Sequence, residues 1–482
     1  MQSNTVVKSF LWDLSGKLSR QFVGFGIGIL LARLLSPKEF GLISMAMIFI
    51  AISEYFVNIG LSSAIIQRKD LTEEHLSSSF YLNLGFSVLL ALIFFFLAPF
   101  ISQFFKTPEL TNVVRVISLK LVIGGFTIVQ RALLIKSMKF KVLMRASLTA
   151  SIIGGVVGVA MALNGYGVWS LIFQLLINLS VESITIWYFS EWKPKLLFKL
   201  NALKELWSYG LNLFFSGLIN VLFQQLDAFV IAKVFSKETL GLFNRARNLN
   251  NFVIRYSSDS INSVMFPAMT ALQNNKEKMV RIGLKAESLV SFFTFALLGW
   301  LYLTAEPLIL FLLGNKWEGA IEIYKLLCLS GFVYPLSVTT LNMIKASGDS
   351  RTILKIETIK NIVNVSGLII GFLFGLKGYL ISLIFSGSIN LLINMLFARK
   401  SLHLKINNQL AHIYIYPIIT IGIVLLLGFI QIELSNFVKL IILTILFFGI
   451  YILINLLLKT FSMKYVQSKL ELVYINLRNK MK

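Results

Sequence analysis

The feature that most constrains this chain is a succession of long apolar segments separated by short polar loops. A helix that crosses the ~30 Å hydrocarbon layer of a bilayer needs about 20 predominantly apolar residues. Fourteen segments meet this requirement, near residues 12–35, 41–66, 78–101, 112–135, 146–164, 166–190, 206–235, 239–271, 286–305, 319–345, 359–376, 378–398, 412–431 and 438–458. The sequence therefore predicts an all-α polytopic membrane protein with about fourteen transmembrane helices.

Composition agrees with this prediction. Of the 482 residues, 56% are hydrophobic and 14% are charged, whereas soluble domains average about 45–50% apolar and about 25% charged residues. Cys328 is the one cysteine, and the three histidines, His75, His403 and His412, lie in or beside predicted loops and form no ligand cluster. These counts exclude a disulfide framework and a cysteine-based metal site. We expect no metal and no cofactor.

The distribution of positive charge predicts the topology. Loops on the cytoplasmic side of a membrane carry an excess of lysine and arginine. If the N-terminus is cytoplasmic, cytoplasmic segments hold 26 lysines and arginines and the opposite loops hold 6. This asymmetry predicts that both termini are cytoplasmic and that the protein lies in the inner membrane. It also accounts for most of the net charge of +23, so no nucleic-acid partner is expected.

An internal repeat predicts two similar lobes. Residues 32–42 read ARLLSPKEFGL and residues 232–242 read AKVFSKETLGL, with alanine, serine, glycine and leucine coinciding at an offset of 200. Chance similarity in so biased a composition is the alternative explanation. If the repeat is genuine, we expect the following parts: an N-lobe at 1–190, an amphipathic cytoplasmic linker at 191–205, a C-lobe at 206–400, two further spans at 401–458 and a basic cytoplasmic tail at 459–482.

Charged and polar residues inside the predicted spans are candidate functional groups. A charge in the hydrocarbon region costs about 2.5–3.5 kcal/mol on insertion scales, so it normally faces a partner or a wet cavity. Two spans that the repeat makes equivalent carry polar stripes on one face. The stripe of the first span is Asp13, Lys17, Arg20 and Gly24, and that of the seventh is Gly217, Asn220, Gln224 and Asp227.

Basic groups dominate this intramembrane set, which indicates an anionic ligand. Arg20, Lys120, Arg131 and Arg245 have no acidic partner nearby in the sequence. Arginine can hold a phosphate or diphosphate by paired charge-assisted hydrogen bonds. The candidate substrate-binding residues are Arg20, Lys120, Arg131, Asn220, Gln224, Arg245, Asn251 and Arg255. A structural explanation stands beside this one for Arg255, which Asp259 can neutralise at the spacing i, i+4.

Ion coupling is not obligatory for such a ligand, because an anion that leaves an inside-negative compartment moves down the electrical potential. Three acidic residues within the predicted spans are nonetheless candidate proton or cation sites. They are Glu54, Asp227 and Asp259.

Several segments together resemble the oligosaccharide flippases, also called polysaccharide biosynthesis or colanic-acid-exporter-like proteins, of the multidrug/oligosaccharidyl-lipid/polysaccharide exporter superfamily. They are LARLLSPKEFGL (31–42), VQRALLIKSMKF (129–140), NGYGVWSLI (164–172), DAFVIAKVFSKETLGLFNRA (227–246) and LLGNKWEGAI (312–321). The resemblance implies two six-helix bundles around a central cavity, often with two further C-terminal helices. It implies transfer of an undecaprenyl-diphosphate-linked oligosaccharide repeat unit between leaflets, with membrane lipids and other polysaccharide assembly proteins as candidate partners.

Two rival functions are weighed against this one. A drug or cation antiporter of the same superfamily would need acidic groups in excess, whereas basic groups dominate here. A membrane-embedded glycosyltransferase or polymerase would need paired carboxylates or histidines for acid–base chemistry. The outer loops are short, and Glu306 and Glu318 are the nearest approach to such a pair. We therefore do not expect an enzyme.

Overall fold

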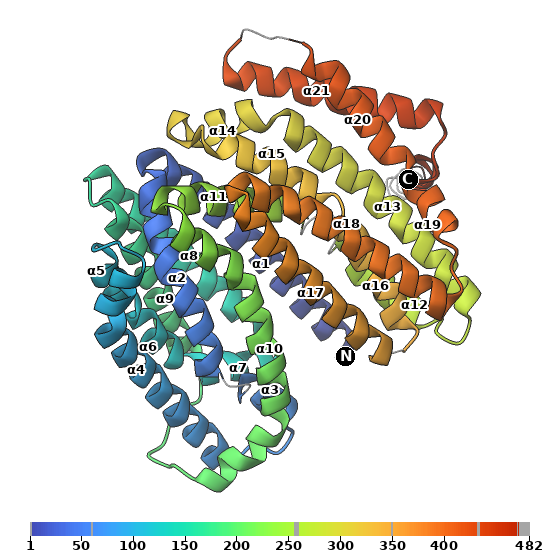
Figure 1. Ribbon diagram of the computed structural model, residues 1–482. Coiled ribbons are helices and arrows are strands. Elements are labelled where there is room, and N and C mark those ends of the chain that lie inside the picture. Colours follow the sequence, from blue (N-terminus) through green and yellow to red (C-terminus); the bar gives the residue numbers. More distant parts are fainter. Residues whose placement is uncertain are drawn as a thin grey trace, which may run out of the picture. The chain divides into compact units, whose positions relative to one another are not determined.

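The computed structural model describes residues 2–58, 61–254, 260–348, 350–430, 434–469 and 471. Throughout these residues the regular structure is helical (Figure 1). The chain divides into two compact units, residues Met1–Asn244 and Arg245–Lys482. Each unit is described by itself.

Unit 1 contains ten complete helices and the first part of an eleventh among the described residues. They are α1 (Gln2–Leu34), α2 (Pro37–Asn58), α3 (Leu61–Gln67), α4 (Glu73–Phe104), α5 (Leu110–Ile117), α6 (Leu119–Gly125), α7 (Ile128–Lys136), α8 (Phe140–Leu163), α9 (Val168–Phe189), α10 (Leu200–Val234) and the first part of α11 (Lys237–Ile254). α10 packs against α2, α3 and α4. For this reason the compact division falls after Asn244, later than the lobe boundary that the repeat predicts.

Unit 2 contains the rest of the chain. Its helices are α12 (Ser260–Thr270), α13 (Lys276–Leu303), α14 (Ala305–Leu313), the short η2 (Asn315–Trp317), α15 (Ala320–Gly331), α16 (Tyr334–Ala346), α17 (Ser350–Leu373), α18 (Gly375–Leu402), α19 (Ile406–Ile413), α20 (Ile415–Gly428) and α21 (Asn436–Leu457). α13 packs against α12, α15, α16, α19 and α20, and α17 lies along α18. α13 is therefore the central helix of this unit.

Ten helices of the described residues are long and apolar enough to cross a membrane. The number rises to eleven if α5–α6 and α7, bent by 41° at the break between them, form one span. The prediction of an all-α, multi-pass membrane protein is confirmed. The other three predicted segments lie in α1, α10 and α11–α12, and the total of fourteen stays a prediction.

Glycines hold α8 close to its neighbours. A Cβ on Gly154 would meet the backbone oxygen of Gln174 on α9 at 2.7 Å, and a Cβ on Gly158 would meet the Gln174 side chain at 2.6 Å. Small residues four apart let two helix backbones approach closely within a membrane. This packing explains why α9 carries Gln174 and Asn178 among apolar residues: both contact α8, where Asn178 Nδ2 lies 3.5 Å from Ser151 Oγ.

The segment before α10 is extended and attached to the start of α4. The backbone N–H groups of Lys195 and Lys199 donate to the hydroxyl oxygens of Ser77 and Ser78 at 3.1 and 2.8 Å. Residues 196–199 are not helical, and α10 runs without a break from Leu200. The predicted linker at 191–205 is therefore not a helix of its own: it is extended up to residue 199 and then forms the start of α10, while its cytoplasmic position stays a prediction. Residues 203–208 contain no glycine or proline, so nothing ends the helix there.

A second contact holds α10 at its first turns. Glu205 Oε2 accepts a hydrogen bond from Arg68 Nη2, and His75 Nε2 lies 3.2 Å from the same oxygen. The hydrogen bond from Arg68, followed by that from His75, lowers the pKa of the Glu205 carboxyl below its ordinary value. Glu205 thereby connects α10 to the end of α3 and the start of α4.

We expect acid to release this contact. A carboxyl with a lowered pKa in the folded state stabilises that state above its ordinary pKa, about 4.3. The stabilisation is lost as the pH falls through the lowered value. A spin label at position 201, in the first turn of α10, with Cys328 replaced by alanine, should become mobile only at acid pH. In Glu205→Gln the label should be mobile at every pH; a label that stays immobile in that variant would contradict the assignment.

The two copies of the sequence repeat meet within unit 1, at the first turns of α2 and α11. A Cβ on Gly41 would lie against the backbone oxygen of Lys237, and a Cβ on Gly241 would lie against that of Pro37. Lys38 Nζ lies 3.6 Å from a carboxylate oxygen of Glu238. Position 37 thus faces 241, and position 237 faces 41. This reciprocity is what a two-fold axis relating the copies produces.

Candidate functional site

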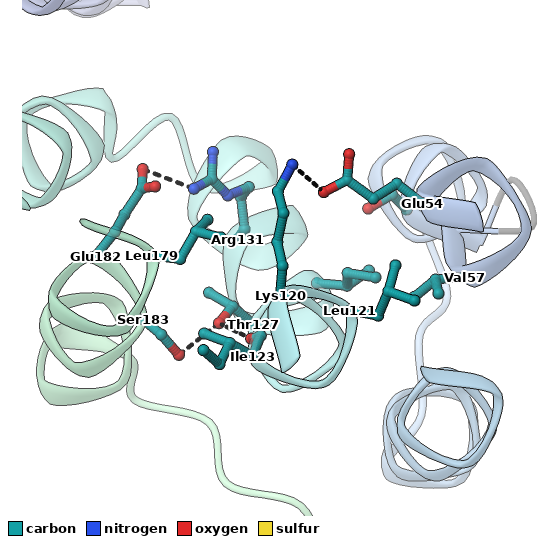
Figure 2. Close-up of a pocket in the computed structure, with 13 residues that line it drawn as sticks. Glu54, Val57, Lys120, Leu121, Ile123, Thr127, Arg131, Leu179, Glu182 and Ser183 are labelled. Atoms are coloured by element: carbon teal, nitrogen blue, oxygen red, sulfur yellow. Dashed lines mark hydrogen bonds and ion pairs between the residues drawn. The ribbon is translucent and has the colours of Figure 1, made fainter. Parts of the chain in front are cut away.

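A cavity of about 400 Å³ lies among α2, α3, α6, α7 and α9 of unit 1. It contains four charged side chains, each from a different helix (Figure 2). The remaining lining residues are mostly apolar, with hydroxyl groups at the side of α9. The lining residues are Glu54, Val57, Ser62, Lys120, Leu121, Ile123, Gly124, Thr127, Ile128, Arg131, Leu179, Glu182 and Ser183.

The first ion pair joins α6 to α2. Lys120 Nζ lies 2.8 Å from Glu54 Oε1. The Lys120 side chain is 12% exposed, whereas that of Glu54 is 45% exposed. The lysine is therefore the enclosed member of the pair, and the carboxylate is the accessible one.

The second ion pair joins α7 to α9 with the opposite arrangement. Arg131 Nη2 lies 2.7 Å from Glu182 Oε1, with the arginine side chain 40% exposed and the glutamate side chain 11% exposed. Here the cation is accessible. A guanidinium carries five N–H donors, and one of its terminal nitrogens makes this contact, so donors remain to meet a ligand.

Figure 2 shows the two pairs in a row, with the Arg131 and Lys120 side chains extending together between the two glutamates. The formal charges of the four groups sum to zero, so the cavity has no net charge. The two cations lie between the two carboxylates. Lys120 and Arg131, which have no acidic partner nearby in the sequence, are each paired in the fold. Their partners lie on other helices, and spacing along one helix cannot identify such pairs.

Lys120 on α6 and Arg131 on α7 line the same cavity on either side of a bend. Lys120 and Arg131 are eleven residues apart, so a continuous helix would place them on one face. Thr127 at the bend bonds Ser183 on α9, with the two hydroxyl oxygens 2.6 Å apart. A Cβ on Gly124 would meet nothing within 4 Å. The helix is thus fixed at the bend, while the absence of a side chain at Gly124 keeps the space open.

The structure brings together three of the predicted site residues, Glu54, Lys120 and Arg131. Arg20 is exposed on α1, and on α10 Gln224 is exposed and Asp227 is half-buried. Arg245 and Asn251 are half-buried on α11. Arg255, Asp259 and the Asn220 side chain lie outside the described residues.

Glu182 and Ser183 are among the residues of the cavity that were not predicted as site residues. Glu182 is visible in the sequence as a charge within the sixth predicted span, but nothing there indicates that it faces Arg131. Ser183 follows it and has no sequence signal of its own. Both depend on the packing of α9 against α6 and α7.

The fold is that of a class of polytopic membrane transporters. The structure matches that of the lipid II flippase MurJ in an inward closed conformation with a TM-score of 0.72, over 93% of this chain and 99% of that chain, at 19% identity. It matches an inward-facing multidrug resistance MATE family transporter of the MOP superfamily with a TM-score of 0.61, over 82% of this chain and 98% of that one, at 18% identity.

A family described as polysaccharide biosynthesis protein matches residues 30–322, and the chain belongs to this family. The succinoglycan biosynthesis transport protein ExoT of Rhizobium meliloti is 26% identical over 70% of this chain and 68% of its own length. The lipopolysaccharide biosynthesis protein WzxC of Escherichia coli is 25% identical over 72% of each chain. The resemblance predicted from sequence segments is confirmed.

Proposed function

We propose that the protein is a flippase that moves an undecaprenyl-diphosphate-linked oligosaccharide repeat unit across the bacterial cytoplasmic membrane for surface polysaccharide synthesis. Family membership gives the context of polysaccharide biosynthesis. Relatives named as a transport protein and a lipopolysaccharide biosynthesis protein, and a fold relative named as a lipid II flippase, support transport of a lipid-linked sugar. In this proposal the protein is a carrier and not an enzyme.

The observation that carries the proposal is the position of Arg131. This guanidinium lies in a cavity of about 400 Å³ on a candidate span, and 40% of its side chain is exposed although Glu182 contacts it. Such a charge is costly within a membrane unless a partner or a wet cavity compensates for it. A diphosphate suits the remaining donors because arginine binds two phosphate oxygens at once.

The mechanism that we propose is alternating access. Arg20, Lys120, Arg131, Arg245 and Arg255 attract the diphosphate, while Asn220, Gln224 and Asn251 contact the sugar and the polyprenyl tail remains among membrane lipids. Both termini are placed in the cytoplasm because most loop lysines and arginines then lie on the inner side. The lipid-linked sugar would accordingly enter from the cytoplasmic leaflet and leave on the other.

The test is flipping in proteoliposomes that contain a short-chain lipid-diphosphate oligosaccharide. Arg20→Ala and Arg245→Ala should each slow flipping at least tenfold, which corresponds to the loss of about 1.4 kcal/mol of binding. Lys316→Ala, a change in a loop basic residue outside the proposed path, is the matched control and should flip at the wild-type rate. Wild-type flipping by both arginine variants would remove the electrostatic basis of the proposal.

The same proteoliposomes distinguish a flippase from a drug or cation antiporter. An organic-cation carrier needs an accessible unpaired carboxylate, whereas both glutamates of the cavity contact a cation at 2.7–2.8 Å. We therefore expect no pH-driven uptake of ethidium by the proteoliposomes. Ethidium uptake without movement of the lipid-linked sugar would favour the antiporter.

A further inference from the structure

A fully buried glutamate lies in unit 2. Glu287 on α13 is 0% exposed, and so is Thr340 on α16. Thr340 Oγ1 lies 2.7 Å from Glu287 Oε1. The second carboxyl oxygen, Oε2, is buried without a hydrogen-bond partner. In the sequence Glu287 stands at the edge of a predicted span, which gave no indication of this burial.

The surroundings of Glu287 are apolar on both sides along the helix. One turn before it, a Cβ on Gly283 would meet the sulfur atoms of Met343 on α16 and Met269 on α12. On the other side Val290 belongs to an apolar cluster with Leu336 of α16. Thr340 lies between Leu336 and Met343 on the facing helix. The carboxyl group is therefore packed among apolar side chains, and the Thr340 hydroxyl is its hydrogen-bond partner; Ser291 Oγ, one turn further along α13, donates instead to the Glu287 backbone oxygen.

No charge compensates for Glu287 among the described residues. The titratable side chains on α13 and on the helices packed against it make no hydrogen bond or ion pair with its carboxyl group. They are Lys276, Glu277, Lys278, Arg281, Lys285 and Tyr302 of α13, Glu306 of α14, Glu322, Tyr324, Lys325 and Cys328 of α15, Tyr334 and Lys345 of α16, His412 of α19, Tyr416 of α20, and Lys439 and Tyr451 of α21.

The two contacts of the Thr340 hydroxyl favour the protonated form of Glu287. Thr340 Oγ1 lies 3.0 Å from the Leu336 backbone oxygen as well as 2.7 Å from Glu287 Oε1. A threonine hydroxyl has one proton to donate and can also accept. If Glu287 carries a proton on Oε1, it donates to Thr340, and Thr340 donates to Leu336. Both contacts are then hydrogen bonds. If Glu287 is ionised, Thr340 can satisfy one of them, and a buried carboxylate keeps a single donor.

We propose that Glu287 is a proton-binding residue of the transport cycle, protonated while α13 and α16 are packed as observed. Its proton passes to water when this contact opens, and the carboxylate that remains needs hydration that the closed contact cannot give. Protonation of Glu287 and closure of the α13–α16 contact therefore favour each other. The coupling half of this inference rests on the proposed flippase function, whereas the protonation half does not.

The protonation of Glu287 is tested by the difference between the infrared spectra of the purified wild type and of Glu287→Gln, both without any lipid-linked sugar. The wild type should show the carbonyl band of a buried carboxylic acid, and Glu287→Gln should lose it. A glutamine side chain is nearly isosteric with glutamic acid, and its amide can donate to Thr340 as the acid does, so the variant should fold. Glu322→Gln, at an exposed carboxylate of the same unit paired with Lys377, should keep the band. An unchanged band in Glu287→Gln overturns the proposal.

If Glu287→Gln does not fold, a second variant tests whether Glu287 is protonated. Thr340→Val removes the hydroxyl that accepts the proposed hydrogen bond and keeps Glu287 in place. The acid band should shift to the higher frequency of a carbonyl group without that hydrogen bond, while Thr340→Ser should leave it unchanged. An acid carbonyl band whose frequency is the same in Thr340→Val as in the wild type would overturn the assignment.

Proteoliposomes with an imposed pH gradient test the coupling half. Flipping by the wild type should change with the gradient, whereas flipping by Glu287→Gln should continue but no longer respond to it. A wild-type response in this variant would overturn coupling through Glu287. Failure to move the lipid-linked sugar under any condition would instead overturn the proposed function and leave the infrared result standing.

Discussion

Arg131→Ala is expected to reduce flipping at least a hundredfold and also to destabilise the protein. The substitution removes the accessible cation of the cavity, and it leaves Glu182, which is 11% exposed, without the guanidinium that lies 2.7 Å away. Removal of one member of a fully buried ion pair costs about 3–5 kcal/mol because an uncompensated charge remains, and the cost here should be smaller because the arginine side chain is 40% exposed. The midpoint of thermal unfolding in detergent and the initial rate of flipping measure the two effects.

A double variant separates these two effects. In Arg131→Met/Glu182→Gln neither charge remains, so thermal stability should return close to that of the wild type, since apolar or neutral replacement of a buried pair is often neutral or stabilising. Flipping should stay low because no guanidinium is left to bind the diphosphate. Arg131→Lys keeps the charge without the planar fork and should retain part of the activity.

The outcome depends on comparing stability and transport in the same preparations. If the double variant recovers both the unfolding midpoint and flipping, Arg131 serves only to hold α7 against α9. Recovery of stability alone assigns a ligand-binding role to the guanidinium. Glu54→Gln provides the matched comparison at the Lys120–Glu54 pair. It leaves Lys120 enclosed and removes the carboxylate that lies 2.8 Å from its Nζ.

The sequence predicted the helices of this protein far better than the partners of its charges. Apolar length alone is enough to place a span, so the positions of most helices agree with the prediction. Lys120 and Arg131 lie on a helix pair that is long and apolar enough to be a span, but Glu54 and Glu182 reach them from other helices. Such pairing depends on how helices pack, and the spacing of residues along one helix carries no information about it.

Glu287 and the linker illustrate two other limits. Glu287 stands near the lysines and arginines at the start of α13, so its position suggests an interfacial residue, yet packing against α12 and α16 encloses it. The linker predicted at 191–205 has an amphipathic pattern, but the Ser77 and Ser78 hydroxyls accept hydrogen bonds from the backbone of Lys195 and Lys199 and hold this part extended. In both cases tertiary contacts override the local pattern.

The second large effect is expected at the contact between the two copies of the repeat. Gly41→Ala should destabilise the protein by about 1–3 kcal/mol, the usual range for overpacking, and separate the first turns of α2 and α11. Alanine normally stabilises a helix by about 0.5–1 kcal/mol relative to glycine. A loss of stability in Gly41→Ala would therefore indicate a steric contact at this position. The reason is steric: the new Cβ would lie against the Lys237 carbonyl oxygen, and Gly241→Ala would place one against Pro37.

Two measurements follow the separation. With Cys328 replaced by alanine, cysteines at positions 38 and 238 should be joined by a short bifunctional thiol cross-linker, because the ends of the native Lys38 and Glu238 side chains lie 3.6 Å apart, and Gly41→Ala should suppress the reaction. The double variant Gly41→Ala/Gly241→Ala should be less destabilised than the sum of the single variants, since both methyl groups require the same displacement.

Gly85→Ala on α4 is the matched control, because a Cβ there would meet nothing within 4 Å. It should leave cross-linking unchanged and raise the unfolding midpoint slightly. If Gly41→Ala behaves in the same way, the close approach of the two copies does not exist in the folded protein. If only Gly41→Ala is harmful and Gly241→Ala is harmless, the reciprocity is wrong, because a two-fold relation makes the two positions equivalent.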